Sequence, residues 1–229
     1  MNSSLIVPLN PTPEQAARLQ ALQTAFAEVC NALAPVVREK RCWNRVTLHH
    51  LTYHALRERF PQIGSQMVCN AIYSVCRTSR LVYQHPNSPF NVTRLADAPL
   101  PLIRFIASAP VYFDRHTLSI KNGKLSMYTL DGRMRFQLDL KPEDLERFQN
   151  EKLLEIVLSK TMRGYQLAFA FLAADVAGET DTDVDTASDT AEARLELPEY
   201  VIVQPEDEHF EITPAGRQSA TNTLSAQSQ

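Results

Sequence analysis

The sequence has few glycines and lacks the short motifs that usually mark enzyme sites. Only 6 of its 229 residues are glycine, so loops that cradle phosphates with backbone amides are scarce. It contains no P-loop, no dinucleotide fingerprint and no nucleophile elbow. We therefore expect no independent small-molecule enzyme, no catalytic residue and no cofactor.

Cysteine is also sparse, and its spacing does not suit a zinc ribbon. The four cysteines are Cys30, Cys42, Cys69 and Cys76, and none forms a C-x-x-C pair. Cys69 and Cys76 share one helical face by their spacing, which favours two small buried apolar side chains. A reducing cytoplasm disfavours disulfides between them.

Three histidines, His49, His50 and His54, form the one cluster that invites a metal-site interpretation. His50 and His54 are one helical turn apart, but zinc needs further ligands, and none follows at a fixed nearby spacing. We expect no metal site. Polar surface and hydrogen bonds to RNA remain the alternatives for these side chains.

Long hydrophobic runs are missing as well. No stretch approaches the roughly 18 to 20 apolar residues of a membrane span, and residues 1–8 lack the basic segment of a signal peptide. We expect a cytoplasmic protein with no membrane partner.

Charge is distributed unevenly along the chain. Residues 1–172 hold 21 Lys and Arg against 13 Asp and Glu (+8), whereas residues 173–229 hold 2 against 13 (−11). Residues 175–196 are rich in Asp, Thr, Ala and Ser, which predicts a disordered acidic low-complexity tail. The asymmetry suggests a basic body that binds an anionic partner, with an acidic tail that competes with this partner for the body. The alternative is an ordinary domain with a solubilising tail.

The first part of the chain has helical periodicity after one short strand at residues 4–9. Thr12, Pro13 and Gln15 form a capping box with proline at the first helical position, and Pro35 ends or kinks the helix that follows. Thr47 and Ser65 are predicted to cap two more helices, which run to about residues 60 and 83. The three helices predict a small bundle.

From residue 102 onward the period changes to that of strands. Asn122-Gly123 and Asp131-Gly132 predict tight hairpin turns, because type I′ turns need positive φ at both central positions. Strands are expected at residues 110–114, 117–121, 124–130, 133–139, 153–159 and 165–172, with a short helix from residue 141. We predict an α+β fold, a small antiparallel β-barrel with the three-helix bundle inserted after its first strand. The expected domains are 1–10 with 90–172, 11–89 as the insertion, and 173–229 as the tail, in which 200–203 reads as a lone strand or binding motif.

Several of these segments, in this order, resemble the N-terminal region of the TnpB (OrfB) family of transposon-encoded, RNA-guided nucleases, which are related to type V CRISPR effectors. Residues 9–15, Leu-Asn-Pro-Thr-Pro-Glu-Gln, are close to the family's L-x-P-T-x-E-Q opening. Residues 56–66, Leu-Arg-Glu-Arg-Phe-Pro-Gln-Ile-Gly-Ser-Gln, are similar to its L-R-x-x-Y-P-x-L-P-S-Q. Further matching pieces are Phe26, Asn31, and residues 71–75, 111–114, 118–120 and 125–127. The resemblance implies a wedge-like β-barrel with a helical recognition lobe inserted in it.

The likeness ends where the family has its RuvC-like nuclease domain. The sequence contains no Gly-Ile-Asp strand and no C-x-x-C ribbon, and Asp181, Asp183 and Asp185 lie in the low-complexity run. Two-metal catalysis requires carboxylates held rigidly around ions roughly 4 Å apart. We therefore expect a protein without nuclease activity.

Basic clusters are the strongest functional signal in residues 1–172, because Lys and Arg neutralise phosphates. Trp43 lies between two arginines, where it could stack on a base or pack as a core aromatic. The candidate nucleic-acid-binding residues are Arg38, Lys40, Arg41, Trp43, Arg45, Arg77, Arg80, Lys121, Lys124, Arg133 and Arg135. For each cluster the alternative is a solvated protein surface.

Taken with the basic clusters, the resemblance implies a nuclease-lacking TnpB-like protein whose partner is a structured guide-type RNA, with the RNA–DNA duplex or flanking DNA as further ligands. One alternative is a protein-interaction adaptor for a separate nuclease or transposase subunit. A decayed transposase remnant is the other.

Overall fold

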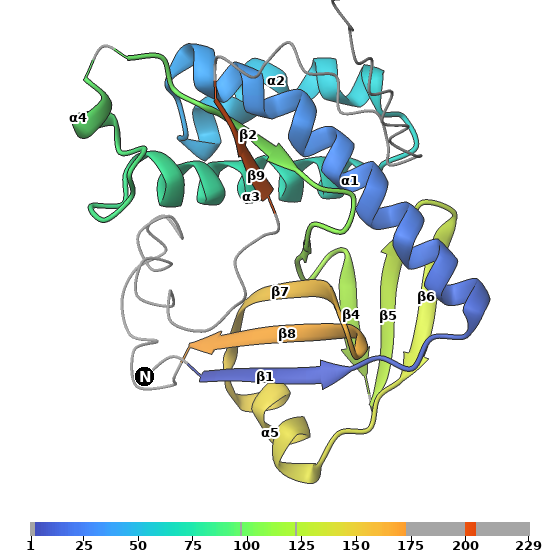
Figure 1. Cartoon of the computed structure of the whole chain (residues 1–229). Helices are drawn as coiled ribbons and strands as arrows, with labels where there is room; N and C mark the ends of the chain where they lie inside the picture. The colour runs from blue at the N-terminus through green and yellow to red at the C-terminus, as the bar shows by residue number, and fades with distance from the viewer. Residues whose placement is uncertain (1–2, 97, 122, 173–199, 205–229) are drawn as a thin grey trace, which may run out of the picture.

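A computed structural model describes residues 3–96, 98–121, 123–172 and 200–204. It shows a mixed α+β fold in which the long helices and one two-stranded sheet occupy one part, while two larger antiparallel sheets and a short helix occupy the other (Figure 1). The prediction of an α+β fold with antiparallel sheets is therefore confirmed. The predicted disorder of the acidic tail lies outside the described residues, apart from the short segment at 200–204.

Three helices form the helical part, α1 (Pro13–Lys40), α2 (Arg45–Arg59) and α3 (Ser65–Tyr83), and a single turn, α4 (Val92–Leu95), follows them. The capping box at the start of α1 is confirmed, because Thr12 Oγ1 accepts from the Gln15 amide while Gln15 Oε1 accepts from the Thr12 amide. α1 continues past Pro35 to Lys40, so of the two effects expected of this proline, ending or kinking the helix, the first is wrong. The exposed proline costs one helical hydrogen bond, and buried Leu33 and Val37 on either side keep the last turns packed on the core.

The other two helices begin slightly earlier than the sequence suggests. Asn44, rather than Thr47, caps α2, and its side chain accepts from the Thr47 amide at 2.9 Å. Gly64, rather than Ser65, is the N-cap of α3, and no side chain caps that end. Both α1 and α2 pack against α3, which is buried along most of its length.

The strands form three antiparallel sheets. The largest has the order β1-β8-β7-β3, a second has the order β4-β5-β6, and β2 pairs with β9. The bounds are β1 (Ser3–Pro8), β2 (Leu102–Phe105), β3 (Val111–Phe113), β4 (Leu118–Lys121), β5 (Lys124–Thr129), β6 (Gly132–Gln137), β7 (Lys152–Thr161), β8 (Gly164–Leu172) and β9 (Tyr200–Val203). Pairing among the described strands yields no closed barrel, which corrects the predicted architecture.

Glycine permits both predicted hairpins of the β4-β5-β6 sheet, though not in the same way. Lys121 pairs with Lys124 across the first turn, where Gly123 has φ 70°. In the second hairpin Thr129 pairs with Gly132, so the two-residue loop is Leu130-Asp131 and Gly132 comes after it, with φ 111°. The two-residue loop is therefore displaced by one residue from the predicted Asp131-Gly132, and it is not the predicted type I′ turn, because neither Leu130 nor Asp131 has positive φ.

Two inner sheet faces and one short helix enclose the core of the β part. Leu125, Met127 and Phe136 of the three-stranded sheet are buried, as are Leu167 and Phe169 of β8. Helix α5 (Pro142–Asn150) closes one side, where the Phe148 ring meets the rings of Phe169 and Phe171 edge-on at 5.0 and 5.2 Å between centroids.

Helix α1 links the sheets to the helical part. Asn31 Nδ2 donates to the Phe105 carbonyl at 2.9 Å, and the Phe105 amide donates to Asn31 Oδ1 at 2.8 Å. Gln23 Nε2 donates to the carbonyls of Ser108 and Ala109. The segment that follows β2 is thus held along α1. Strand β9 pairs with β2 as its antiparallel neighbour, with Tyr200 opposite Phe105. The segment at 200–203, predicted as a lone strand or a binding motif, is a paired strand.

Candidate nucleic-acid interface

The outer face of the β4-β5-β6 sheet gathers four of the predicted basic residues. Alternation along each strand places Lys121, Lys124, Arg133 and Arg135 on the same side as Tyr128, and all five side chains are exposed. Register brings them together across the strands, since Lys121 faces Lys124 and Tyr128 faces Arg133. We call these four cations and Tyr128 the basic sheet face.

The charge of the basic sheet face is not balanced within the sheet. None of the three strands contains an aspartate or a glutamate. The remaining outer positions are held by the neutral residues Ser119, Ser126 and Gln137. Like charges on neighbouring strands repel each other, so a polyanion laid on this face would relieve that repulsion as well as pair with the cations.

Arg133 is held in a fixed position beside the tyrosine. Its guanidinium carbon lies 4.1 Å from the centroid of the Tyr128 ring. The same guanidinium donates to Ser126 and to the His116 carbonyl at 3.2 to 3.3 Å. Tyr128 keeps 43% of its surface exposed. A cation stacked on an exposed ring offers both a phosphate contact and a surface for a base.

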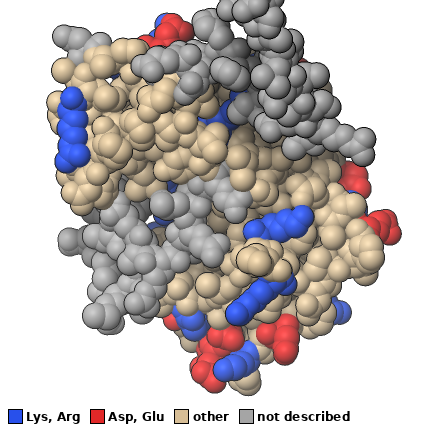
Figure 2. Space-filling view, in the orientation of Figure 1, with Lys and Arg blue, Asp and Glu red and all other residues tan. Residues whose placement is uncertain are grey.

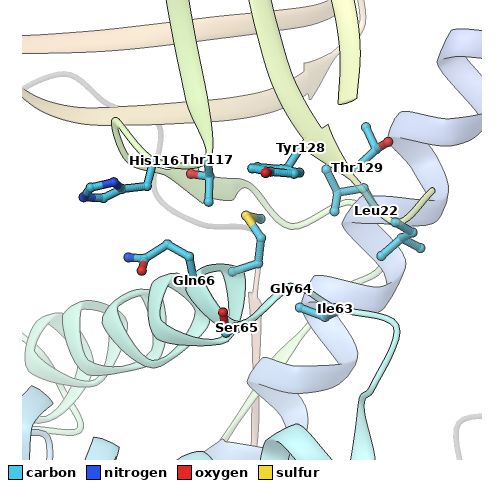
Figure 3. A pocket seen from close by; sticks show the side chains of 11 residues that line it. Leu22, Ile63, Gly64, Ser65, Gln66, His116, Thr117, Tyr128 and Thr129 are labelled. Carbon is cyan, nitrogen blue, oxygen red and sulfur yellow. The ribbon is translucent and has the colours of Figure 1, made fainter. Parts of the chain in front are cut away.

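A pocket of about 380 Å³ opens beside Tyr128 (Figure 3). It lies between the ends of the strands and the first turn of α3, with Tyr128 and Thr129 on one wall and Gly64, Ser65 and Gln66 on the other. Sequence reasoning missed both the pocket and Tyr128. Alternation along the strands places Tyr128 on the face of Lys124 and Arg133 and could have indicated it, whereas the pocket depends on a helix more than fifty residues earlier in the chain.

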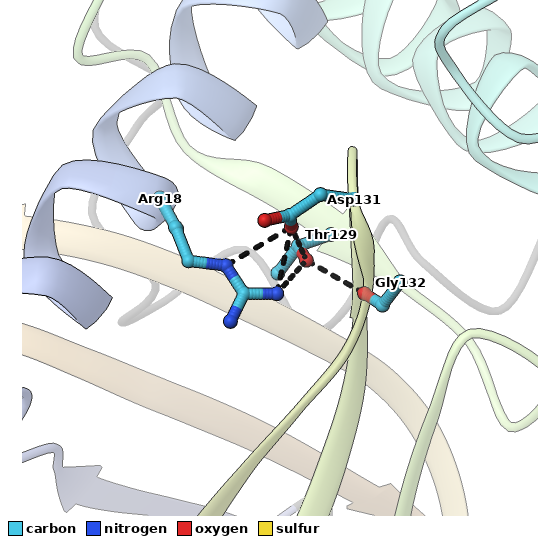
Figure 4. A network of polar contacts seen from close by, with 4 residues as sticks. All are labelled: Arg18, Thr129, Asp131 and Gly132. Carbon is cyan, nitrogen blue, oxygen red and sulfur yellow. Dashed lines mark hydrogen bonds and ion pairs between the residues drawn. The ribbon is translucent and has the colours of Figure 1, made fainter.

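Polar contacts with α1 fix the hairpin that carries Tyr128 (Figure 4). Arg18 Nη2 contacts Asp131 Oδ1 at 2.7 Å and donates to Thr129 Oγ1 at 3.1 Å. The single hydroxyl proton of Thr129 has two acceptors within reach, Asp131 Oδ1 at 2.8 Å and the Gly132 carbonyl at 2.6 Å. The Thr129 hydroxyl, followed by the Arg18 guanidinium, lowers the pKa of Asp131. The end of the sheet is therefore tied to α1 rather than left as a free hairpin.

The predicted residues around the end of α1 are placed elsewhere and have partners of their own. Lys40 pairs with Glu39 at 2.7 Å. Arg41 ends α1 with φ 46°, and its Nη2 donates to the Ala98 carbonyl at 3.3 Å. Arg38 is half-buried and interacts within the protein. These residues do not join the basic sheet face.

Trp43 and Arg45 cover the core instead of forming an open stacking platform. The half-buried Trp43 packs against the hydrophobic core, with its ring 5.8 Å from the Tyr83 ring and tilted by 40°. The Arg45 guanidinium lies over the Tyr73 ring at 5.5 Å from its centroid. Trp43 therefore packs as a core aromatic, which the sequence left open as the alternative to stacking on a base.

Arg77 belongs to a polar network between α3 and the largest sheet. Its Nη1 donates to the Tyr112 hydroxyl at 2.8 Å, and its Nε lies 3.8 Å from Glu155 Oε1. The Tyr73 hydroxyl donates to the same Glu155 oxygen at 2.9 Å. The side chains of Arg77 and Glu155 are only 14% and 11% exposed. Arg80, the next predicted residue on α3, is half-buried and also interacts within the protein.

Stability is expected to fall at alkaline pH because of this network. Burial, opposed in part by the nearby Arg77 charge, raises the pKa of Tyr112 to about 12, and burial followed by the Glu155 charge raises that of Tyr73. An unfolded tyrosine ionises near pH 10, so the stabilisation is complete below about pH 10 and is lost as pH rises toward 12. Thermal unfolding between pH 8 and 11.5, followed with tyrosinate absorbance, should show the melting temperature falling only above about pH 10. If every tyrosine of the folded protein were ionised by about pH 10, the raised pKa values of Tyr73 and Tyr112 would be contradicted.

The histidines of α2 stack on one another and on tyrosine rather than converging on a metal. His49 lies against Tyr53 with 4.6 Å between ring centroids, and His50 and His54 make edge contacts with His49 and Tyr53. Within the residues that the structure describes, no group of three or more His, Cys, Asp or Glu side chains could hold a metal ion. None of the four cysteines forms a disulfide; Cys30 and Cys76 are buried, and Cys42 and Cys69 are partly so.

The face of the molecule drawn in Figure 2 gives less indication of a binding surface. On the face drawn in Figure 2, Lys and Arg side chains lie in small separate groups, with Asp and Glu among them over the β-rich part. None of the described helices is long and apolar enough to cross a bilayer.

Comparisons with known proteins do not identify a family. No protein-family model matches the sequence, and no curated protein matches it. The resemblance to the TnpB family therefore stays a prediction.

Proposed function

We propose that the protein binds nucleic acid, and RNA in the first place, through the basic sheet face. The observation that carries the proposal is the presence of four cations and an exposed, arginine-stacked tyrosine on one sheet face whose strands contain no acid. The predicted residues on and after α1 and α3 contribute to the fold in this proposal and do not form the primary binding surface.

The physical case combines charge with stacking. Each phosphate neutralised by Lys or Arg releases counterions, which makes binding favourable and dependent on salt. Exposed aromatic rings on a sheet stack on unpaired bases, a mode that RNA-binding sheets use. The net charge of −3 for the whole chain does not oppose this, because binding depends on local charge rather than on the total.

The resemblance of residues 1–172 suggests which RNA is bound. The ligand in this proposal is a structured guide-type RNA, with an RNA–DNA duplex or flanking DNA beside it, and any cleavage is performed by a separate nuclease chain. The β sheets would then serve as the wedge-like domain at 1–10 and 90–172, and residues 11–89 as the recognition-lobe-like insertion.

The test is to purify the protein from its native host, sequence the RNA that accompanies it, and measure binding of that RNA against salt. We expect one enriched structured RNA whose affinity falls steadily as salt rises, with a slope of about −3 in a log–log plot if four phosphates of an unpaired strand are contacted. Affinity independent of salt would rule out the basic sheet face as the binding surface.

A protein-interaction adaptor is the second candidate, and exposed apolar residues on α2 favour it. Val46 and Leu51 keep 56% and 57% of their surfaces exposed. The same purification distinguishes the two functions, because recovery of a stoichiometric protein partner without enriched RNA would support the adaptor.

A further inference from the structure

The pocket beside Tyr128 adjoins the basic sheet face, and one residue belongs to both. Tyr128 stands opposite Arg133 on the outer face of the sheet, and it also lines the pocket. Figure 3 shows its ring at the ends of the strands, across from the first turn of α3. A chain of phosphates running over the cations therefore passes the mouth of the pocket.

The walls of the pocket combine apolar surface with several polar groups. Met67 and Ile63 supply buried apolar surface on the helical side. Ser65, Gln66, His116 and Thr129 add hydroxyl, amide and imidazole groups around it. Mostly apolar walls with a few orienting polar groups are typical of pockets that bind small organic groups, and about 380 Å³ lies within the usual range of such pockets.

The Tyr128 ring can stack a ligand on one face only. Arg133 covers one face of the ring, with its guanidinium carbon 4.1 Å from the centroid, so a flat partner would have to stack on the opposite face. The guanidinium is itself fixed by Ser126 and the His116 carbonyl. The ring and the cation thus form a pre-positioned pair, which reduces the entropy lost on binding.

We infer that this pocket accepts one unpaired nucleobase of a strand whose phosphates lie on the basic sheet face. The base would stack on Tyr128, and its edge would meet the polar groups of the first turn of α3. The inference rests on the proposed function and makes it more specific, because a base inside a duplex cannot enter the pocket without leaving its stack. The protein therefore prefers an unpaired strand, whether RNA or DNA, over a duplex.

Methionine methyl signals provide a direct test in the full chain. Met67 lines the pocket, whereas Met162 lies at the β7–β8 turn and is fully exposed. With ¹³C-methyl-labelled methionine, we would titrate the protein with three probes of one sequence, each about 12 nucleotides long: single-stranded RNA, single-stranded DNA and duplex RNA. We expect the unpaired strands to move the Met67 signal while Met162 stays in place, and the duplex to leave both unmoved.

Three substitutions test whether binding and the Met67 signal depend on the Tyr128 ring and on the open volume of the pocket. Tyr128→Ala should weaken binding of unpaired RNA about tenfold, whereas Tyr128→Phe, which keeps the ring, should retain most of the affinity. Ser65→Trp, at an exposed position in the wall, should fill the pocket and abolish the Met67 shift. Tyr53→Ala, which removes a half-buried tyrosine from α2, is the matched control and should change nothing.

The outcomes separate the inference from the proposed function. If RNA binds in a salt-dependent way while Met67 stays unmoved and Tyr128→Ala equals Tyr128→Phe, the pocket inference is wrong and the basic sheet face stands. A duplex that moves Met67 as strongly as the single strand also overturns the inference. If none of the three probes binds, both are wrong. If RNA and DNA move Met67 equally, base and phosphate alone are recognised, whereas a larger effect of RNA adds a contact to the 2′-hydroxyl.

Discussion

Replacing Arg77 by methionine is expected to lower the free energy of unfolding by about 3 kcal/mol. The substitution leaves Glu155 almost buried, with Tyr73 as its remaining polar partner among the contacts of this network. A buried charge that loses its counter-charge cannot recover the energy of its desolvation. Chemical denaturation followed by circular dichroism measures the loss. The matched control is Arg163→Met at an exposed turn, for which a change within about 0.5 kcal/mol is expected.

A second substitution shows whether the uncompensated charge is the cause. In the double variant Arg77→Met with Glu155→Gln, the amide still accepts from Tyr73 but carries no charge. We expect the double variant to be more stable than Arg77→Met alone, because the buried negative charge is gone. If the double variant is less stable by the sum of both single effects, the two residues act independently and the uncompensated Glu155 charge is not the cause of the loss.

Neutralising the basic sheet face is expected to reduce affinity for unpaired RNA on the order of 100-fold at about 0.1 M salt. The variant combines Lys121→Gln, Lys124→Gln, Arg133→Gln and Arg135→Gln. Each lost phosphate contact lowers the log–log salt slope by roughly 0.7, so the slope should become shallower by about 3. Fluorescence anisotropy over a range of salt concentrations measures both quantities. The four side chains are exposed, so the variant should remain folded.

A second set of four cations provides the control. The control variant combines Lys141→Gln, Lys152→Gln, Arg104→Gln and Arg163→Gln, all at exposed positions outside the basic sheet face. It changes the net charge by the same amount. If both variants lose affinity equally, binding follows total charge and has no defined surface on this sheet.

Local signals in the sequence predicted most of the elements. The capping box at Thr12 and Gln15 and the glycines of the hairpins act within a few residues, so they are visible in the chain. Where the local signals failed, packing decided. α1 continues through Pro35 because buried residues follow it, and Asn44 instead of Thr47 starts α2 because its side chain reaches the amide three residues on.

The candidate site was only partly predictable, for the same reason. The sequence indicated the four sheet cations as basic residues of the hairpin strands, and their common face follows from period-2 alternation, which involves only neighbouring strands. Arg77 looks equally basic in the sequence, but its partners Tyr112 and Glu155 lie far along the chain. Trp43 likewise stands between two arginines in sequence, whereas its ring packs near Tyr83. Residue type shows that charge is present, and only tertiary contacts show whether that charge is available.

The pairing of β1 with β8 determines when the largest sheet can be completed. Ser3 lies opposite Phe171, and β1 has β8 as its one neighbour among the described strands. During synthesis the first strand must therefore wait for nearly the whole described body to be made, whereas α1, α2 and α3 can form from contacts closer in the chain. Until then β1 exposes an unpaired edge that includes the apolar residues Leu5, Ile6 and Val7, a segment prone to pairing with other chains. We expect slow final folding and a nascent chain that depends on protection of its first strand.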